Sequence, residues 1–579
     1  MARYRKHTSQ ILYTDSFRGI DAAAKDGGFS AAVTMRNYRV TPQHKLKKRC
    51  GYKKLTDGVV CDSCFCAVIG GAEYFIYKNG TALHAIRLSD LTRYGCDTGS
   101  AGCVGYFVFG SAAYIYGVGS YYKFDGARFC AVEPYIPTVA VSCTNSGAGT
   151  LFESLNIISD KAKISYSPDG VSASFVLPSD AAAVVSVELD GDTLDGSGYG
   201  YDAATHTLTL SSVPQGGVPD SLIVTFSLDG EAVLSMPFPG RKFCLYGGAR
   251  DTRVFAYGGG NVIRYSDVTT AGPDVTYFPA DNFITVGDGT EDVTALIRHF
   301  DRLMVFTERQ TWFLSPSSVD YDGYSKPAFP LSPLNQNVGS YGGGAAYADN
   351  SPYTLSYDGI YKFGQSTVRD ERNAKRISDG VSSYISPTFL KYASVYDCER
   401  EKEIWMCCGG GALIYNYGID AFYYYDGIPA QYVFGFDGGV AFYSGAAIYV
   451  FSEACADDDG QGFSASFESG FVTLDRTVRG RRLRRVCMSF DSDGASSVTL
   501  YAVPDRGNAA GARFTGSPDH GGFDFGRVDF TSFSFGCSAK RAHAEYRVQL
   551  SSFECLKIMI TSGESDGALT VGSVSLIVD

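Results

Sequence analysis

The sequence predicts an all-β fold: a β-propeller of about six or seven blades, with an inserted β-sandwich domain and a C-terminal, jelly-roll-like β-sandwich domain. Three observations predict it. The 579 residues include 40 tyrosines, 38 phenylalanines and 67 glycines, a composition typical of strands joined by tight turns. Short alternating strands recur roughly every 25 to 45 residues, close to the period of propeller blades. Helix signals are few along the whole chain.

The segment 261–314 is the clearest example of the recurring unit. It contains a strand ending at Tyr265, a second strand at Asn282–Val286, and a hairpin formed by Asp301–Phe306 and Glu308–Leu314. Such apolar, aromatic strands would expose many edges in an open sheet, and radial closure into a propeller avoids this. A long β-sandwich or a solenoid is the structural alternative.

Changes in amino-acid composition divide the chain into segments. Aromatic residues become rare after Pro134, where Ser, Ala, Val and Asp replace them between Asp-Gly turns, and they return after Gly240. The segment 454–462 is rich in Asp and Gly and is typical of a linker. We therefore expect a basic N-terminal arm (1–55), a first propeller part (56–134), an inserted β-sandwich (135–240), a second propeller part (241–455) and a C-terminal β-sandwich (456–579).

Charge is distributed unevenly. Residues 1–54 carry a local charge of +10, which leaves −22 for the remainder of a chain whose net charge is −12 (−12 minus +10). The run Lys45, Lys47, Lys48 and Arg49 favours either a solvated edge strand or contact with an anionic partner, which would be DNA or an acidic protein surface. The acidic remainder argues against a general nucleic-acid-binding surface, because such surfaces must neutralise phosphates.

A second basic cluster lies in the predicted C-terminal sandwich. Alternation along a strand is expected to place Arg482 and Arg484 on one face and Arg481 and Arg485 on the other. Three interpretations stay open: an interface with a neighbouring subunit, a solvated strand, and nucleic-acid contact. The cluster comprises Arg476, Arg479, Arg481, Arg482, Arg484 and Arg485.

No spacing in the sequence indicates catalysis or metal binding. The seven histidines are scattered, and no HExxH, GxSxG or P-loop pattern occurs. Cys61, Cys64 and Cys66 lack the second half of a zinc site, and the acidic loops 287–292 and 457–460 lack calcium-loop spacing. We therefore nominate no catalytic, cofactor or metal residue, expect no cofactor, and expect that the chain is not an enzyme.

The sixteen cysteines interrupt strand-like runs rather than forming a disulfide framework, so we expect reduced thiols that pack as small hydrophobes. No run of about 18 apolar residues is present, so no membrane-spanning segment is expected. The basic N-terminus lacks the apolar stretch of a signal peptide. These features predict synthesis and folding in a cytosol.

Five segments together resemble tailed-bacteriophage β-propeller proteins, the head-to-tail hub, nozzle and packaged-DNA stabilisation components. The N-terminal segments Asn37–Pro42 and Lys47–Tyr52 are similar to the N-terminal turn and the arginine–proline–glycine–tyrosine element of those proteins, with Cys50 in place of the usual proline. The resemblance covers about residues 30–130 and 240–450 and leaves out the inserted sandwich. The segments are Asn37–Pro42 with Lys47–Tyr52, Ile263–Asp267, Tyr277–Val286, Asp301–Leu314 and Gly339–Tyr361.

This resemblance implies a structural virion protein, made in the cytoplasm of a bacterial host and placed in the phage tail or at the head–tail junction. Such proteins form homo-oligomeric rings near the portal, close its channel, retain packaged DNA and dock adsorption parts. The implied partners are the portal or adaptor, fibres or spikes, and packaged DNA through non-specific contact. The alternative is a receptor- or glycan-binding adhesin at the tail tip, and a glycan depolymerase is a third option.

Overall fold

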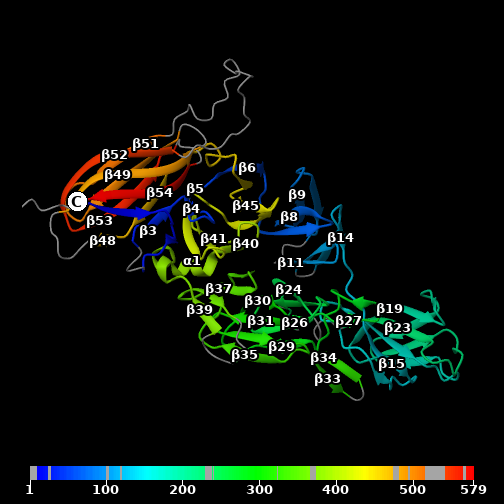
Figure 1. Ribbon diagram of the computed structural model, residues 1–579. Coiled ribbons are helices and arrows are strands. Elements are labelled where there is room, and N and C mark those ends of the chain that lie inside the picture. The colour runs from blue at the N-terminus through cyan, green and yellow to red at the C-terminus, as the bar shows by residue number, and fades with distance from the viewer. Residues whose placement is uncertain are drawn as a thin grey trace, which may run out of the picture. The chain divides into compact units, whose positions relative to one another are not determined.

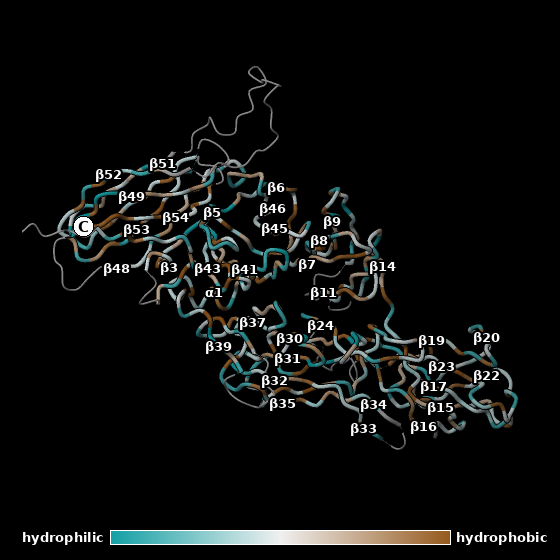
Figure 2. Tube along the Cα trace, viewed as in Figure 1, coloured by the Kyte–Doolittle hydropathy of each residue, from teal (hydrophilic) through white to brown (hydrophobic). Residues whose placement is uncertain are grey.

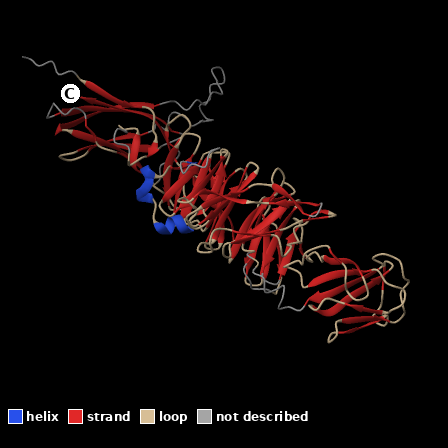
Figure 3. Ribbon diagram, turned by 90° about the horizontal axis from the view of Figure 1, so that it is seen from below, coloured by secondary structure: helices blue, strands red, loops and turns tan. Residues whose placement is uncertain are grey.

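The computed structural model divides into two units, residues 1–61 with 338–579, and residues 62–337. Nearly all of its regular structure is strand, and the helices of the described residues, blue in Figure 3, are short. The structure describes residues 9–23, 28–99, 104–117, 120–228, 238, 240–321, 324–364, 373–473, 481–492, 496–515, 542–564 and 569–579.

The fold is a β-propeller with an inserted and a terminal β-sandwich, as the sequence predicts. Within the described residues, seven four-stranded antiparallel sheets form the blades, four in one unit and three in the other. In each unit the first strands of successive blades contact one another, which is the arrangement of innermost propeller strands. Figure 1 shows the blade strands.

Blades 1 to 4 belong to residues 62–337. Interleaved apolar side chains hold neighbouring blades together, as where Tyr74 and Ile76 of blade 1 pack near Ile115 and Phe124 of blade 2. Two hairpins extend from blades 3 and 4: β27–β28 (Val268–Thr269, Gly272–Pro273) and β33–β34 (Ser317–Tyr321, Tyr324–Ala328). The blades comprise β7 (Ser63–Ile69), β8 (Ala72–Asn79), β9 (Ala82–Arg87) and β10 (Arg93–Asp97); β11 (Val104–Phe109), β12 (Ala112–Gly117), β13 (Ser120–Phe124) and β14 (Phe129–Ala131); β24 (Lys242–Tyr246), β25 (Arg253–Tyr257), β26 (Val262–Tyr265) and β29 (Phe283–Thr285); and β30 (Val293–His299), β31 (Arg302–Thr307), β32 (Thr311–Leu314) and β35 (Leu331–Asn335).

Blades 5 to 7 belong to the other unit. Blade 7 takes its outermost strand, β6 (Gly51–Asp57), from the N-terminal part of the chain, where it pairs antiparallel with β46. A 3-10 helix (Asp379–Tyr384) and α1 (Pro387–Tyr392) join blades 5 and 6; Ser386 caps α1 by accepting a hydrogen bond from the Phe389 amide. The remaining strands are β36 (Ala345–Ala348), β37 (Ser351–Ser356), β38 (Gly359–Phe363), β39 (Ala374–Arg376), β40 (Ser394–Cys398), β41 (Glu403–Cys408), β42 (Gly411–Asn416), β43 (Ala421–Asp426), β44 (Tyr432–Phe436), β45 (Gly439–Ser444) and β46 (Ala447–Ser452).

The inserted sandwich interrupts the chain between blades 2 and 3. Its two sheets enclose a core that includes Tyr166, Phe175, Leu208 and Phe226. One sheet has six strands and the other has three. The larger consists of β16 (Thr150–Leu151), β15 (Thr138–Cys143), β17 (Lys161–Tyr166), β23 (Leu222–Leu228), β19 (Ala181–Leu189) and β20 (Asp192–Thr193), and the smaller of β18 (Ser174–Val176), β22 (Thr207–Leu210) and β21 (Tyr199–Asp202).

The terminal sandwich is built from both ends of the chain, so the expected arm at residues 1–55 is wrong. Its six-stranded sheet contains three N-terminal strands and its seven-stranded sheet two more. Figure 1 shows the blue N-terminal strands beside orange and red C-terminal ones. The sheets are β1 (Gln10–Thr14), β4 (Tyr38–Val40), β5 (Leu46–Lys48), β54 (Leu569–Val578), β49 (Arg481–Ser492) and β52 (Ala542–Phe553); and β2 (Gly19–Ile20), β3 (Ala31–Arg36), β47 (Ala465–Ser469), β48 (Val472–Thr473), β53 (Cys555–Ser562), β50 (Ser497–Pro504) and β51 (Ala510–Thr515).

Hydrophobic residues recur along the strands of the blades and of both sandwiches (Figure 2). The fourteen cysteines within the described residues form no disulfide bond with one another. Cys407 is an example of one that packs as a hydrophobe, since burial raises the pKa of its thiol to about 12. A search of the described residues finds no helix long and apolar enough to cross a membrane.

Candidate functional site

Arg49, one of the predicted interface residues, lies inside the molecule. Its guanidinium donates to both carboxylate oxygens of Asp458, over 2.7 and 2.5 Å, and its Nε donates to the side-chain oxygen of Asn37. The ring of Phe463 lies 3.8 Å from the guanidinium carbon. With two further hydrogen bonds to the carbonyls of Cys50 and Asp426, all five N–H groups of Arg49 are used within the chain.

The three lysines of the same run also contact their own chain. Lys45 donates to the carbonyls of Asp15 and Gly572, Lys48 is buried and donates to the Gly563 carbonyl, and Lys47 pairs with Glu453 at 2.6 Å. The positive charge of residues 1–54 is therefore matched in part by carbonyls and carboxylates of the terminal sandwich and blade 7. The expected interface role of Lys45, Lys47, Lys48 and Arg49 is not supported by these positions.

The arginine strand, β49, differs from the expected alternation because it is bulged. The register shifts between Leu483 and Arg485 against both neighbouring strands. Against β54 the extra residue is Arg484, whereas against β52 the extra residue lies in β52, between Arg547 and Leu550. As a result Arg482, Arg484 and Arg485 are all exposed, while Leu483 is buried. A bulge re-aims side chains in this way. The prediction that Arg485 faces away from Arg482 and Arg484 is wrong.

The structure adds an arginine that the sequence analysis missed. Arg547 of β52 lies directly opposite Arg485 in the strand register. Like charges directly opposite each other destabilise a sheet, so this pair carries a cost. Arg485 offsets part of it through a 2.6 Å ion pair with Glu545, which also belongs to β52. Only the strand register identifies Arg547, since no other lysine or arginine lies within five positions of it in the sequence.

Around these arginines the surface forms an open groove with a volume of about 570 Å³, which we call the arginine groove. Arg484 pairs with the side chain of Asp579. Within the part of the chain that the structure describes, the guanidinium groups of Arg482 and Arg547 have no carboxylate partner. Arg481 instead donates to Gln10 over 3.4 Å, and Arg476 and Arg479 lie outside the described residues. The groove is lined by Arg482, Leu483, Arg484, Arg485, Arg547, Val548, Gln549, Leu550 and Ser551.

The arginine groove can bind carboxylate or phosphate groups, because each guanidinium presents a planar fork of donors. Ser551 is the one hydroxyl among the side chains that line the groove, and no His, Asp, Glu, Cys or Tyr lines it beside that hydroxyl as a proton-transfer group. No group of three or more His, Cys, Asp or Glu residues suited to a metal ion occurs among the described residues.

Comparison with known proteins finds only weak similarity to solved structures. No family model and no curated protein matches the chain. Among solved structures, TmCBM61 in complex with β-1,4-galactotriose is similar at 13% identity, with 23% of this chain and 72% of that chain covered and a TM-score of 0.15. The exo-β-1,3-galactanase of Phanerochaete chrysosporium, with galactose, is similar at 10% identity, with 92% and 100% covered and a TM-score of 0.18.

These comparisons correct one expectation. The prediction that the chain is not an enzyme is contradicted, because three of the similar structures are of an exo-β-1,3-galactanase. With a TM-score of 0.18, the likeness carries no argument for a galactanase activity here. The absence of enzymatic activity is therefore withdrawn as a prediction, and no activity takes its place.

Proposed function

We propose that this chain is a structural virion protein of a tailed bacteriophage, which forms part of the portal-proximal tail hub or nozzle. There it would close the channel, retain packaged DNA and dock adsorption parts. The proposal rests on the resemblance of five segments to such proteins and on an interrupted propeller fold compatible with it. It also places the protein in the virion after synthesis in the bacterial cytoplasm.

The observation that carries the proposal is the interlock between the two ends of the chain. Residues 10–48 supply strands to both sheets of the terminal sandwich, and the very next strand, β6, completes blade 7. Only residues 49–50 separate β5 of the sandwich from β6 of blade 7, so moving the two apart would strain the strand pairs on both sides. A part that holds pressurised DNA benefits from such a connection, because load falls on many hydrogen bonds at once.

The arginine groove supports a ring of identical subunits. The groove is a basic surface in which Arg482 and Arg547 have no carboxylate partner among the described residues, on a chain with a net charge of −12, so an acidic surface of a second copy would complement it. Carboxylates from that copy would also offset the repulsion between Arg485 and Arg547. DNA is the weaker candidate, because the acidic chain as a whole repels phosphate.

Electron microscopy of intact particles tests the proposal. The expected result is density for this chain in a ring at the portal vertex, with several copies in symmetric contact. Particles that lack the protein should lose their DNA or fail to hold a tail. If such particles keep both, the proposal is wrong; density at fibre tips, with binding of the purified protein to host envelopes, would favour the adhesin instead.

A further inference from the structure

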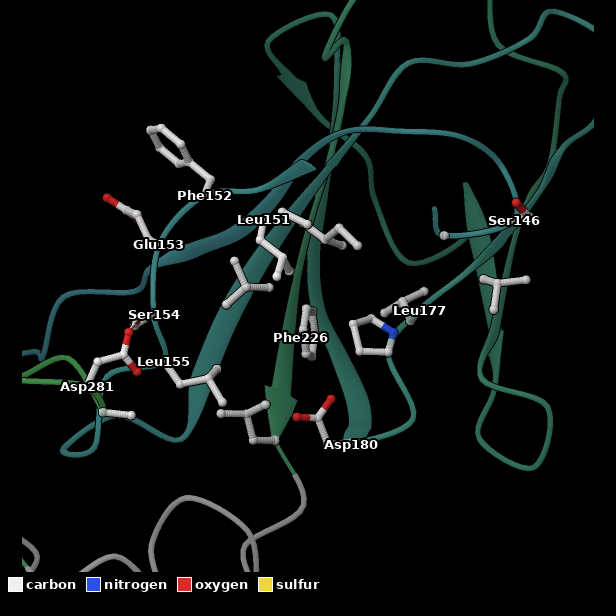
Figure 4. A pocket seen from close by; sticks show the side chains of 18 of the residues that line it. Ser146, Leu151, Phe152, Glu153, Ser154, Leu155, Leu177, Asp180, Phe226 and Asp281 are labelled. Carbon is white, nitrogen blue, oxygen red and sulfur yellow. Dashed lines mark hydrogen bonds between the residues drawn. The ribbon is translucent and has the colours of Figure 1, made fainter. Parts of the chain in front are cut away.

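The inserted sandwich contains a cavity of about 790 Å³ that opens to the surface (Figure 4). Its floor is the inner face of the six-stranded sheet, where Ala140, Ile164 and Phe226 come from three neighbouring strands. Leu177 and Leu228 complete the floor, and all five side chains are buried. A cavity of this size with an apolar floor is suited to an apolar ligand group.

The cavity is open because the opposing sheet is too small to cover it. Strand β18, at the edge of the three-stranded sheet, has only three residues. At the mouth of the cavity the surface is also apolar: Leu151 is 87% exposed, Phe152 62% and Val176 40%. Two adjacent, strongly exposed apolar side chains beside an open core mark a surface that gains free energy when it is covered.

Charged side chains surround this mouth, and most are acidic. Glu153 accepts hydrogen bonds from the Tyr135 hydroxyl at 2.9 Å and the Thr138 amide at 2.6 Å, and Asp281 accepts one from Ser154.

Asp180 differs from the other two carboxylates. In Figure 4 its carboxylate lies beside Phe226 at the cavity. The described residues offer it no hydrogen-bond or ion-pair partner. Lys326, from the β33–β34 hairpin, is the one cation among the lining residues.

We propose that this cavity binds a peptide segment of a partner protein that inserts a large apolar side chain and carries a lysine or arginine next to it. The apolar side chain occupies the cavity, and the adjacent cation meets the carboxylate of Asp180. Leu151 and Phe152 lie outside the floor, so the ligand must cover both the hole and its rim. A peptide does this, whereas a single small molecule in the cavity would leave the rim exposed.

The site is held rigidly, which favours binding. The sandwich joins blade 3 through a hydrogen bond from the Ala280 amide to the Leu155 carbonyl. Buried Asn156 donates to the carbonyls of Tyr135 and Thr276 and accepts from the Phe278 amide. These bonds fix the lining segment 151–155 in advance, so a ligand loses less free energy in ordering it. The inference does not depend on the proposed place in a virion.

Fluorescence anisotropy with the full-length protein tests the proposal. The probes are a short fluorescein-labelled peptide with a central Leu-Phe pair flanked by lysines, the same peptide flanked by glutamates, and a dansylated alkylamine. We expect the lysine peptide to bind at least about tenfold more tightly than the glutamate peptide, since a factor of ten needs only a modest difference in binding free energy. Equal binding of both peptides, or binding of the alkylamine alone, overturns the proposal.

Variants locate the binding. Asp180→Asn should weaken the lysine peptide about fivefold to tenfold, and the double variant Leu151→Ser, Phe152→Ser should weaken both peptides. The matched controls are Asp190→Asn, at an exposed turn whose backbone conformation asparagine tolerates, and Val171→Ser, an exposed apolar residue that does not line the cavity. If a control weakens binding as much as its partner variant, or Asp180→Asn has no effect, the cavity is not the site.

Discussion

The guanidinium of Arg49 and the carboxylate of Asp458 form a bidentate ion pair, Nη1 to Oδ1 at 2.7 Å and Nη2 to Oδ2 at 2.5 Å, and their side chains are only 1% and 8% exposed. Arg49 directly follows β5 of the terminal sandwich and Gly51 begins β6 of blade 7. Asp458 belongs to the segment that leads from blade 7 back to the sandwich. The ion pair therefore links the two segments that connect the terminal sandwich to blade 7, one between β5 and β6 and the other between β46 and β47.

Arg49→Met should destabilise the protein strongly. Removing the cation leaves the buried carboxylate of Asp458 unpaired, and breaking a buried ion pair typically costs about 3–5 kcal/mol. The double variant Arg49→Met, Asp458→Leu should recover much of that loss, because no isolated charge then remains inside. Urea unfolding of the full chain, followed by tyrosine fluorescence, measures both effects.

The neighbouring pair Lys54–Asp459 is the control for this experiment. Its charged atoms are 3.9 Å apart and its side chains are 43% and 39% exposed, so Lys54→Met should change the unfolding midpoint little. Equal midpoint shifts in Arg49→Met and Lys54→Met would show that burial of the Arg49 pair does not matter, contrary to our account.

Gly51→Ala should prevent β6 from pairing properly in blade 7. A Cβ atom at position 51 would lie 1.7 Å from the carbonyl oxygen of Asp457, and a backbone atom cannot move aside cheaply. Overpacking of this kind typically costs about 1–3 kcal/mol, with larger values where the backbone must shift. Hydrogen exchange should then show faster exchange of the β6 and β46 amides in the variant.

Gly196→Ala provides the comparison. This glycine has nothing within 4 Å of the added Cβ, so exchange in blade 7 should stay as in the unsubstituted protein. Unchanged protection of β6 in Gly51→Ala would mean that the close approach to Asp457 does not constrain the strand.

The element at residues 49–52 could be recognised from the sequence, but its contacts could not be predicted from it. It was identified by resemblance, and the structure supplies physical reasons: Arg49 is half of a buried pair, Gly51 passes close to a carbonyl, and Tyr52 packs edge-on against Phe442. Sequence spacing could not reveal this, since the contacts of these residues lie about 400 positions away. The same limit hid the N-terminal strands, which pair only with distant parts of the chain.

The propeller could be predicted from the sequence because most of its strands pair with strands that are close to them in the chain. The segment 261–314 was expected to hold strands at its start, near Phe283 and on either side of Glu308, and β26, β29, β31 and β32 lie there. These strands belong to two neighbouring blades, not to one. The prediction of which arginines share a face of β49 was wrong because Arg484 is an extra residue in the pairing with β54 and reverses the alternation after it, and no residue pattern marks this bulge.

Stability should fall as pH rises from about 4 to 7, and Asp397 should cause much of the change. Burial, with a smaller contribution from Glu399, raises the pKa of this carboxyl from 3.8 to about 6. Between pH 4 and 7 the Asp397 carboxyl therefore binds more protons in the folded state than in the unfolded state. Through this group the free energy of unfolding decreases as pH increases. After discounting for solvent around a half-buried group, roughly 1–2 kcal/mol is expected.

Asp397→Asn should remove most of this slope and raise stability at pH 7, because the amide stays neutral. Unfolding curves at several pH values between 4 and 7.5 measure the slope for both proteins. Asp437→Asn, at an exposed turn where the backbone suits asparagine, should keep the original slope. A slope that survives in Asp397→Asn would assign the pH dependence to other groups.

Charge reversal in the arginine groove should abolish self-association without unfolding the chain. The double variant Arg482→Glu, Arg547→Glu changes two exposed side chains that have no carboxylate partner within the described residues, so the fold loses no ion pair that the structure shows there. The substitutions would turn attraction between the groove and the acidic surface of a second copy into repulsion. Bringing like charges together at an interface costs several kcal/mol. Arg506→Glu, 74% exposed and outside the groove, is the control. Light scattering coupled to size exclusion should show rings for the control and monomers for the double variant; rings in both would remove the groove from the subunit interface.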